Sequence, residues 1–572
     1  MSLNSEVAEV LSEIGEIYAA TGDPFRSRAF RTAAQRIASL TEDIRDVHAE
    51  GRLMEIPGVG RSIASIIEEY LESGSCALLE ELRESLPPGV LELMQLEGVG
   101  PKTALRLNRE LGITSIDQLE DAARAGKLRG LRGFGAKTEE NILKAIEEHR
   151  SRQRRHLLGG LLPLIRGITS YLRMDGAALG VEVVGSARRM AETVGDIDIL
   201  VSSKRPLEVV RRFTSMPNVT RVVTRGRTRS TVILGKGVQV DLRVVPPESY
   251  GAALQYFTGS KDHNIKLRKI ARSRGLKLSE YGLFERSSGK RIAGEDERGI
   301  YQHLGLSWIE PELREDRGEI EAAAEGRLPR LVGYDEVRGD LHIHTNWSDG
   351  TGSIEEMAEK ARSMGLKYIA ICDHSKSLGI ARGLDEERLR RQMGEIDRLN
   401  GEMEGLTILK GVECNIRADG SLDLPDNLLR DLDIVVAAVH SGFKSDEEQM
   451  TMRLIEAIHN ENVSAIAHPT GRIIQRRRGY PLDLERVLEA AREQGVMMEI
   501  NAFPDRLDLD ELNCRRAKEM GVTLCIGTDA HTPDQMDFLP LGVAVARRGW
   551  LEAGDLANTL DAEDLLRRIE RG

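Results

Sequence analysis

Apolar side chains recur at helical spacing through the first 150 residues of the chain, and short glycine-containing turns interrupt them. Three of these turns are related in sequence: residues 56–60 (IPGVG), 96–103 (LEGVGPKT) and 131–138 (LRGFGAKT). Each turn follows one predicted helix and opens the next. The pattern therefore predicts an N-terminal region of helices joined by tight hairpins.

The next part of the chain has shorter apolar runs, separated by glycine and polar turns, as is typical of strands. We expect strands at 181–184, 197–202, 231–234 and 238–245. A basic helical stretch follows from Tyr250 to Ser273. Residues 311–329 are charged, have a proline at each end, and are interpreted as a helical or loose linker.

Beyond Tyr334, apolar runs alternate with helical segments to the end of the chain. The runs lie at 341–344, 368–372, 407–413, 434–440, 464–468, 496–501 and 522–527. Most of them end in, or just before, a polar or metal-binding residue. That arrangement predicts a β/α barrel whose site residues lie at the C-terminal ends of its strands.

Composition indicates a multidomain protein of the soluble globular type, since 572 residues exceed a single core and 40% of them are hydrophobic. The longest apolar runs, at 161–165 and 434–439, are too short to span a bilayer. Residues 1–9 lack the basic start and apolar core of an export signal. The five cysteines contain no C-x-x-C pair and favour a reducing compartment. We expect a cytoplasmic protein.

The net charge of −12 conceals a strongly uneven distribution. Residues 1–100 hold 8 Lys/Arg and 18 Asp/Glu, and residues 331–572 hold 30 and 45. Residues 151–300 instead hold 28 Lys/Arg against 14 Asp/Glu. A basic block between two acidic ones suits a polyanion-binding middle region, although a solvated charged surface would look the same.

The glycine hairpins are candidate DNA contacts, because glycine allows a positive φ and the following helix start presents free N–H groups to an anion. One such hairpin can simply join two packed helices. Three copies, two of them followed by Lys-Thr, favour sequence-independent contact with a DNA backbone and resemble helix-hairpin-helix motifs. The expected contact residues are Gly58, Gly60, Gly98, Gly100, Lys102, Thr103, Gly133, Gly135 and Lys137.

Three carboxylates give the middle region its candidate chemistry. Asp196 and Asp198 are two residues apart, so both project from one face of a strand, and Asp241 on another predicted strand can join them. Mg²⁺ with oxygen ligands is suited to neutralising such a group. Two ions held there could activate a 3′-hydroxyl and support a leaving pyrophosphate. For Asp-x-Asp alone, surface aspartates on an ordinary strand remain the alternative.

The surrounding residues resemble the nucleotidyltransferase signature of family X DNA polymerases. A Gly-Ser turn, an arginine three positions later, Gly-Asp-Ile-Asp at 195–198 and the segment 256–260 carry the likeness, which covers residues 1–317. It implies that Asp196, Asp198 and Asp241 are the catalytic metal ligands. It also implies nucleotide contacts from Gly185, Ser186, Arg189, Tyr256, Phe257, Gly259, Asn264 and Arg268, with Arg155 as a further triphosphate contact. Lys261 departs from the family, in which an acidic residue often packs on the incoming base.

A second group of metal-binding residues follows the runs of the C-terminal part. Six of the twelve histidines occur here, and paired imidazoles such as His342 and His344 suit Zn²⁺, Mn²⁺ or Fe²⁺. A lone histidine at a strand end is usually structural, but six are hard to explain in that way. The group consists of His342, His344, Asp349, His374, Glu413, His440, His468, Asp529 and His531.

This constellation resembles the PHP (polymerase and histidinol phosphatase) domain, a distorted β/α barrel that holds up to three metal ions. All nine ligand positions of that family are occupied, which implies an active phosphoesterase. Asp340 is expected to orient a ligand histidine, whereas His459 lies in a helical stretch and is not expected to be a ligand. Arginines that could hold a phosphate backbone are Arg472, Arg476, Arg477, Arg478 and Arg506.

The two resemblances predict a multidomain α/β protein. Its expected parts are an N-terminal helical, lyase-like DNA-binding domain (1–85), a helix-hairpin-helix fingers-type domain (86–150), a mixed-sheet nucleotidyltransferase palm (151–247), a thumb (248–317), a linker (318–334) and a PHP barrel (335–572). We expect a monomeric gap-filling repair polymerase that uses gapped or primer-template DNA and dNTPs. Its second activity would be a 3′–5′ exonuclease, with abasic-site endonuclease and 3′-phosphatase activities left open.

The implied ions are Mg²⁺ or Mn²⁺ at the polymerase site and Mn²⁺ or Zn²⁺, up to three, at the PHP site. Two alternatives stay open from sequence. In one, the C-terminal domain hydrolyses a small phosphate ester and the N-terminal part is a tether. In the other, the chain is a catalytically silent DNA-binding scaffold, which the full occupancy of both metal sites disfavours.

One activity of some relatives is not expected here. They excise a 5′-deoxyribose phosphate through a Schiff base formed by a lysine just after the first hairpin. This chain has no lysine from Met1 to Pro101, and Ile66 and Ser62 stand where the nucleophile and a supporting lysine are expected. Lyase activity is therefore predicted to be weak or absent.

Overall fold

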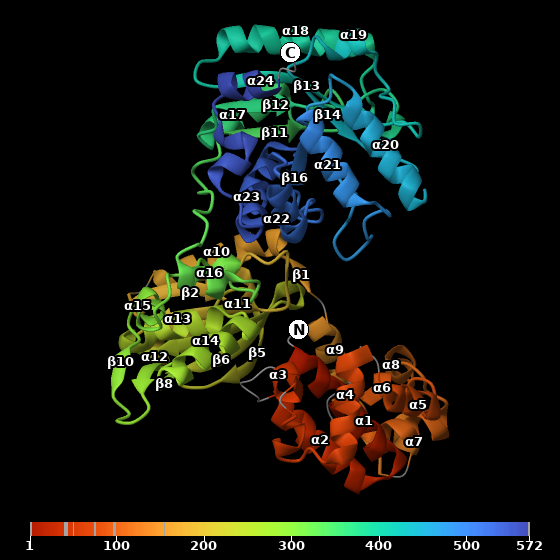
Figure 1. The fold of residues 1–572 in the computed structure, drawn as a ribbon, viewed down its shortest axis with the longest axis vertical. Helices are drawn as coiled ribbons and strands as arrows, with labels where there is room; N and C mark the ends of the chain where they lie inside the picture. Colours follow the sequence, from red (N-terminus) through yellow and green to blue (C-terminus); the bar gives the residue numbers. More distant parts are fainter. Residues whose placement is uncertain are drawn as a thin grey trace.

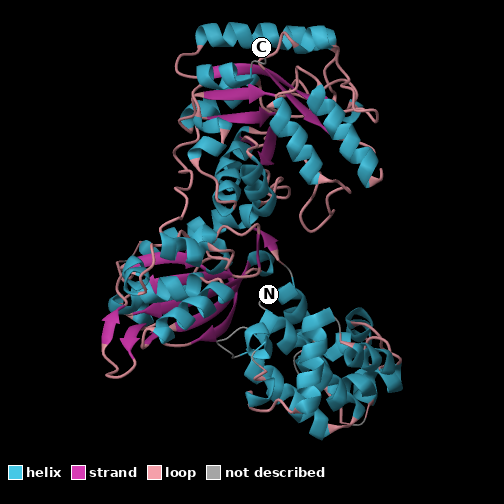
Figure 2. Cartoon of the chain, viewed as in Figure 1, coloured by secondary structure: helices cyan, strands magenta, loops and turns pink. Residues whose placement is uncertain are grey.

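A computed structural model describes residues 3–569 of the protein, except for 39–43, 50, 74–75, 95, 97–98, 132, 154 and 175. Gly98 lies outside the described residues, as does the side chain of Lys102. The chain forms a helical N-terminal region, a middle region built on a mixed sheet, and a C-terminal barrel (Figure 1). Figure 2 shows that the strands are confined to the second and third of these regions.

The N-terminal region is helical throughout its described part and has its own hydrophobic core, in which Leu11, Ile14 and Ile17 are fully buried. Glycines stand at several of its helix ends, as Gly112 ends α7 in the left-handed conformation. Its α-helices are α1 (Leu3–Thr21), α2 (Pro24–Ala38), α3 (Ile44–Ala49), α4 (Arg61–Ser73), α5 (Ala77–Ser85), α6 (Val90–Met94), α7 (Pro101–Leu111), α8 (Ile116–Arg124) and α9 (Ala136–Gln153).

The middle region is built on a five-stranded sheet of order β2-β4-β7-β6-β5, in which β4 and β7 are parallel and the other pairs antiparallel. The four predicted strands are present. β5 was not expected. Nearly all of its side chains are exposed at the sheet edge, so its sequence lacks the alternating apolar residues of a half-buried strand. The elements are β1 (His156–Leu157), α10 (Leu158–Arg173), β2 (Gly180–Val184), α11 (Gly185–Arg188), β3 (Thr193–Val194), β4 (Ile197–Ser202), α12 (Pro206–Thr214), β5 (Val219–Arg225), β6 (Arg229–Leu234) and β7 (Gln239–Val245).

A smaller unit of helices and a three-stranded sheet follows. It comprises α13 (Tyr250–Thr258), α14 (Lys261–Ser273), β8 (Leu276–Ser279), β9 (Gly282–Glu285), β10 (Arg291–Ala293), α15 (Glu297–His303) and α16 (Glu319–Glu325). The segment interpreted as a helical or loose linker contains α16 and is well packed. Arg314 in it is fully buried, and its charge is neutralised by the Glu297 carboxylate, to which it donates a hydrogen bond (2.6 Å).

The C-terminal region is a barrel of seven parallel strands in sequential order, at the seven predicted places. They are β11 (Gly339–Ile343), β12 (Tyr368–Ile371), β13 (Thr407–Asn415), β14 (Ile434–Ala438), β15 (Ala465–Ile466), β16 (Met497–Asn501) and β17 (Leu524–Gly527). The amide of Asp529 donates to the His342 carbonyl (2.8 Å) and that of His344 to the Ala530 carbonyl (2.8 Å), which joins the last strand to the first. The C-terminal ends of all the strands therefore meet at one mouth.

Helices accompany these strands because both faces of the sheet are apolar. Ile369 and Ile371 of β12 pack in one hydrophobic cluster with helical residues such as Met357, whereas Tyr368 and Ala370 belong to another that includes Leu565. The α-helices are α17 (Ile354–Ser363), α18 (Glu386–Glu402), α19 (Asp426–Leu429), α20 (Glu447–His459), α21 (Leu484–Gln494), α22 (Glu511–Met520), α23 (Leu539–Arg548) and α24 (Ala562–Ile569).

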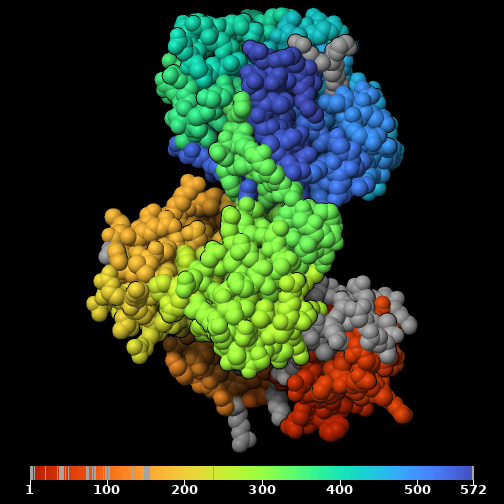
Figure 3. Space-filling view, turned by 60° about the vertical axis from the view of Figure 1, so that its left-hand side comes forward, coloured from red at the N-terminus to blue at the C-terminus, as the bar shows by residue number. Residues whose placement is uncertain are grey.

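The barrel is seated directly on the middle region (Figure 3). A Cβ added to Gly159 of α10 would lie 2.7 Å from Pro504 and 2.8 Å from Leu541, both in the barrel. Only a glycine permits this approach of backbone to side chains. No α-helix in the described part of the chain is both long and apolar enough to cross a membrane.

Candidate functional sites

The three aspartates of the middle region converge at one edge of its sheet. Asp198 on β4 is the register partner of Asp241 on β7, and Asp196 lies just before β4. One carboxylate oxygen from each lies within 4.8 Å of the others. Thr231 donates to Oδ1 of Asp241 (2.5 Å) and Gln239 to Oδ2 (2.7 Å), which fixes that carboxylate. The group has the composition and proximity of a divalent-cation site.

Loss of hydration and mutual repulsion both disfavour the ionised form of these carboxylates. Burial raises the pKa of Asp198 to about 7, and the charges of Asp196 and Asp241 add to the effect. The pKa of Asp196 is raised too, by partial loss of hydration and then by Asp241, although its side chain remains accessible to solvent. A bound cation would offset both effects by stabilising the ionised carboxylates, so the electrostatics favour metal binding.

The glycine-serine turn lies against these carboxylates. Gly185 has a φ of +68°, and a Cβ there would be 2.6 Å from Oδ2 of Asp198. Glycine is thus required both for the turn and for the close approach of the aspartate. Ser186 follows in the single turn of α11 and is partly exposed.

Arg188 and Arg189 connect this turn to the end of α13. Arg188 donates to the Thr258 hydroxyl (2.5 Å), and Arg189 donates through Nη1 to the Thr258 carbonyl (2.7 Å). Gly259, with a φ of +72°, faces Arg189, whose Nη1 would be 3.1 Å from an added Cβ. Arg189 and Gly259, both predicted to contact the nucleotide, therefore lie together.

The remaining predicted nucleotide residues lie around the same helix end. Tyr256 and Phe257 are partly exposed, with their rings edge to face at 5.2 Å. Asn264 on α14 donates to the Tyr256 carbonyl (2.7 Å). Arg268, one turn further along α14, is exposed. Arg155 instead binds the side chain and carbonyl of Thr193.

The nine candidate metal ligands of the barrel gather at the mouth formed by its strand ends, and eight of them form three overlapping groups. Those groups are His344, Asp349, His374 and His531; His342, His344 and Asp529; and His374, Glu413 and His440, with ligand atoms within 4.8 Å in each group. His468, the ninth residue, lies 3.0 Å from Glu413 through Nε2 and Oε1.

Glu413 occupies the centre of this cluster. Its Oε1 lies 3.1 Å from Nε2 of His440, and its Oε2 lies 2.6 Å from Nδ1 of His374 without the alignment of a hydrogen bond. Among the described residues, Oε2 of Glu413 and the Nδ1 atoms of His344 and His374 are buried without a hydrogen-bond partner. Buried polar atoms are rarely left so. Because all three are metal-binding atoms on converging side chains, they fit bound cations.

The pKa values of the cluster favour an ionised carboxylate at its centre. Despite the opposing effect of burial, His440, His374 and His342 hold the pKa of Glu413 well below its ordinary value. His344 has its pKa lowered to about 3, by burial and then by His374 and His531. The neighbouring carboxylates instead raise the pKa values of His342, His374 and His531, against the effect of burial. A bound cation would have to displace those protons, since divalent metals bind the neutral imidazole.

Sequence reasoning missed Glu499 on β16. Its Oε1 lies 2.7 Å from Nδ1 of His342, and its Oε2 accepts from the amide of His468 (2.6 Å). Asp340, expected to orient a ligand ring, binds the His342 amide (3.3 Å) and Thr528 (2.5 Å) instead. A buried carboxylate near the end of a barrel strand was the available signal, because metal-binding histidines usually have such a partner.

The candidate phosphate-binding arginines lie in different surroundings. Arg506 lies 3.4 Å from Oδ2 of Asp529, next to the cluster, and Arg476 and Arg478 are exposed. Arg472 faces the middle region, where it pairs with Glu192 (2.8 Å). Arg477 is held by the Gly471 carbonyl (2.8 Å). Arg506 is therefore the member that contacts the metal-binding residues.

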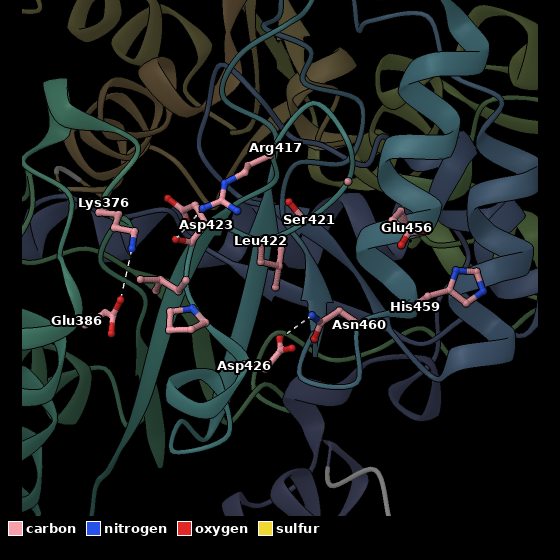
Figure 4. A pocket seen from close by; sticks show the side chains of 13 residues that line it. Lys376, Glu386, Arg417, Ser421, Leu422, Asp423, Asp426, Glu456, His459 and Asn460 are labelled. Atoms are coloured by element: carbon pink, nitrogen blue, oxygen red, sulfur yellow. Dashed lines mark hydrogen bonds and ion pairs between the residues drawn. The ribbon is translucent and has the colours of Figure 1, made fainter.

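A cavity of about 490 Å³ lies in the barrel region and contains none of the nine residues (Figure 4). Lys376 and Glu386 face each other across one side of it (3.5 Å), and Asp426 binds Asn460 on the other (3.0 Å). His459 lines it from the end of α20, away from the metal-binding residues. Its Nδ1 lies 2.7 Å from the Ile455 carbonyl oxygen one turn earlier in α20.

The glycine hairpins stand at helix starts, as their sequences predict. Gly58 and Gly133 have φ values of +92° and +84°, and α4, α7 and α9 begin just after Gly60, Gly100 and Gly135. An added Cβ at these last three glycines would meet open space, so their backbone faces outward. Thr103 lies on α7, and Lys137 is exposed and pairs with Glu140 (2.8 Å).

A sheet with three clustered carboxylates, joined to a barrel with a histidine-rich cluster, defines a class of protein with two separate metal-dependent sites on one chain. Family models give the same division. They match a helix-hairpin-helix domain at 2–76, a SAM-like helix-hairpin-helix tandem at 90–148, the DNA polymerase beta thumb at 253–315 and a PHP domain at 340–503.

Curated relatives extend this comparison to the whole chain. The DNA polymerase/3′-5′ exonuclease PolX of Bacillus subtilis is 40% identical over 99% of both chains. A probable phosphatase of Thermoanaerobacter sp. is 39% identical over 34% of this chain and 78% of its own. DNA polymerase lambda of Arabidopsis thaliana is 28% identical over 54% of this chain and 62% of its own. The chain belongs to the family X DNA polymerases that carry a C-terminal PHP domain.

Proposed function

We propose that this protein is a gap-filling DNA repair polymerase that also trims 3′ ends with its own 3′–5′ exonuclease. The observation that carries the proposal is the presence of two separate clusters of potential metal ligands, in a chain similar over its full length to a polymerase/exonuclease. The substrates are gapped or primer-template DNA and dNTPs, and the working unit is a monomer.

Nucleotide incorporation belongs to the middle region, with 151–247 as palm and 248–317 as thumb. Asp196, Asp198 and Asp241 would hold Mg²⁺ or Mn²⁺, which would supply neutralisation of charge on the phosphates during displacement of pyrophosphate. Gly185, Ser186 and Arg189 bind the triphosphate. The sugar packs on Tyr256, Phe257 and Gly259, while Asn264 and Arg268 monitor the base pair.

Strand trimming belongs to the PHP barrel at 335–572. Its nine clustered residues would hold up to three ions, Mn²⁺ or Zn²⁺, which would supply Lewis-acid chemistry for phosphodiester hydrolysis. Arg506 beside Asp529 is placed to hold a substrate phosphate. The buried unpaired atoms of His344, His374 and Glu413 support this assignment, since no protein hydrogen bond satisfies them among the described residues.

DNA is bound without sequence preference by the hairpins of 1–85 and 86–150. Their exposed glycines lie at helix starts, where main-chain N–H groups can meet phosphates. The basic middle region adds charge attraction. Residues 318–334 join the two enzymatic parts, and we propose a cytoplasmic location for the protein.

A second candidate for the barrel is hydrolysis of small phosphomonoesters, which the similarity to probable phosphatases favours. The discriminating experiment compares turnover of a 3′-hydroxyl oligonucleotide, a 3′-phosphate oligonucleotide and a free phosphomonoester with Mn²⁺. Faster turnover of the oligonucleotides, with release of mononucleotides, supports the exonuclease. Preferential turnover of the free monoester would refute it.

A further inference from the structure

A charged network connects the PHP barrel to the polymerase pocket through Arg189. Oε1 of Glu315 accepts from Nε of Arg189 (3.0 Å) and from Nη1 of Arg548 (3.0 Å), which ends α23 of the barrel. The same Nη1 of Arg548 donates to the main-chain carbonyl of Arg189 (2.7 Å). Arg548 thus contacts Arg189 directly at its backbone and indirectly at its guanidinium.

The network is shielded from solvent, so its charges act strongly on one another. The side chains of Arg548, Arg189 and Glu315 are 6%, 14% and 17% exposed. Although burial opposes it, Glu511 and Glu315 raise the pKa of Arg548, which therefore remains charged. Nη2 of Arg548 also donates to Glu511 (3.1 Å), a residue of the barrel.

Glu315 lies between Arg548 of the barrel and Arg189, and it accepts a hydrogen bond from each. It carries a negative charge a hydrogen bond away from the arginine proposed to bind the triphosphate. With Arg548 present, two guanidinium groups neutralise the carboxylate of Glu315. Nη2 of Arg189 has no hydrogen-bond partner among the described residues, so it can donate to a phosphate. Without Arg548, the full charge of Glu315 would face Arg189, compete with the triphosphate and repel it.

We infer that Arg548 of the PHP barrel is a positioning residue for nucleotide binding at the polymerase site, acting by neutralising Glu315 beside Arg189. The inference rests on the proposed role of Arg189. It makes the docked barrel a part of the polymerase pocket, in addition to its own phosphoesterase site.

The test is steady-state incorporation on gapped DNA by the full-length chain. Arg548→Gln removes the charge but keeps a polar side chain, and KM for dNTP should rise by on the order of tenfold with kcat little changed. Exonuclease activity should stay at the parental level. The matched control is Arg516→Gln on α22, an exposed arginine paired within the barrel to Glu485 (2.5 Å), which should leave KM unchanged.

A second variant separates charge compensation from simple support of the fold. Glu315→Gln alone should leave KM at or below the parental value, and the Arg548→Gln/Glu315→Gln double variant should recover most of the lost affinity. If Arg548 only supports the fold, each single variant would lower incorporation activity to a similar extent, and the double variant would lower it further. That result, or an unchanged KM in Arg548→Gln, overturns the inference.

Arg189→Ala distinguishes failure of the inference from failure of the proposed function. A rise in KM for this variant, with none for Arg548→Gln, would overturn only the role of Arg548. No rise for Arg189→Ala would overturn the proposed phosphate contact and the inference together. A parallel rise in both, reversed by Glu315→Gln only in the Arg548→Gln background, is the expected result.

Discussion

Nδ1 of His342 lies 2.7 Å from Oε1 of Glu499, so the opposite ring nitrogen of His342 points to the metal-binding residues around it. Both side chains are buried almost completely. A carboxylate in this position fixes the orientation of the ring and raises the basicity of its other nitrogen. Glu499 therefore contributes to metal affinity without belonging to the nine.

Glu499→Gln should weaken metal binding at the barrel. The amide keeps the shape of the side chain but loses the charge that orients His342, so affinity for Mn²⁺ should fall by about 10- to 100-fold. Titration calorimetry on the metal-free protein measures this directly. Glu489→Gln, on the neighbouring helix α21, is the control because Glu489 is exposed. Equal affinity of Glu499→Gln and the parent would contradict the assignment.

Asp198 should make the melting temperature of the metal-free protein depend on pH. Asp198 has a folded-state pKa of about 7, above the ordinary value of about 3.9, so folding favours its protonated form. Its stabilising effect is fully present below about pH 4 and is lost as pH rises through 7. Asp198→Asn should consequently raise the melting temperature in chelator at pH 8, and by less at pH 5.5.

Bound metal should remove the advantage in melting temperature that Asp198→Asn has over the parent at pH 8. At pH 8 with Mn²⁺, the parent gains stability from an ion that the Asp198→Asn variant binds poorly, so the two melting temperatures should converge or cross. Asp335→Asn, at an exposed position, is the control and should change neither result. Greater thermal stability of the parent in chelator at pH 8 would contradict the prediction.

The N-terminal region should not form a Schiff base with an incised abasic site. Ser62 and Ile66 on α4 occupy the expected lysine positions, and residues 1–101 contain no lysine. Lyase chemistry needs a neutral amine of lowered pKa close to the sugar. Borohydride reduction of the protein with a 5′-incised abasic duplex should yield little adduct. A strong adduct that maps within residues 2–100 would show that another amine, such as the N-terminus, serves as nucleophile.

Much of this architecture could be predicted from sequence, because buried helices and strands have regularly spaced apolar residues. The seven barrel strands are apolar runs that end in or near ligands, and the sequence pattern locates all of them. β5 was missed since an exposed edge strand has no apolar face. Glu499 was missed because its role depends on its distance from His342, a residue 157 positions away, which no local spacing encodes.

The contacts between regions were also beyond sequence reasoning. Arg189 was assigned to the triphosphate from its place after the Gly-Ser turn, and the structure brings it to Thr258 and Gly259. Its contact with Arg548 joins residues 359 positions apart. Such a pair depends on how the barrel docks on the sheet, and neither residue carries a signal of it in its own segment.

The central claim, two independent metal-dependent activities on one chain, is tested most directly with Asp198→Ala and His344→Ala. Each removes one metal ligand, which should cost several kcal/mol of transition-state stabilisation, or on the order of 10³-fold in rate. A labelled primer annealed to a gapped template, with Mn²⁺, is followed with and without dNTPs. Asp198→Ala should degrade the primer but not extend it, and His344→Ala should extend it but not degrade it. Loss of both activities from one substitution, or retention of both, would contradict the account.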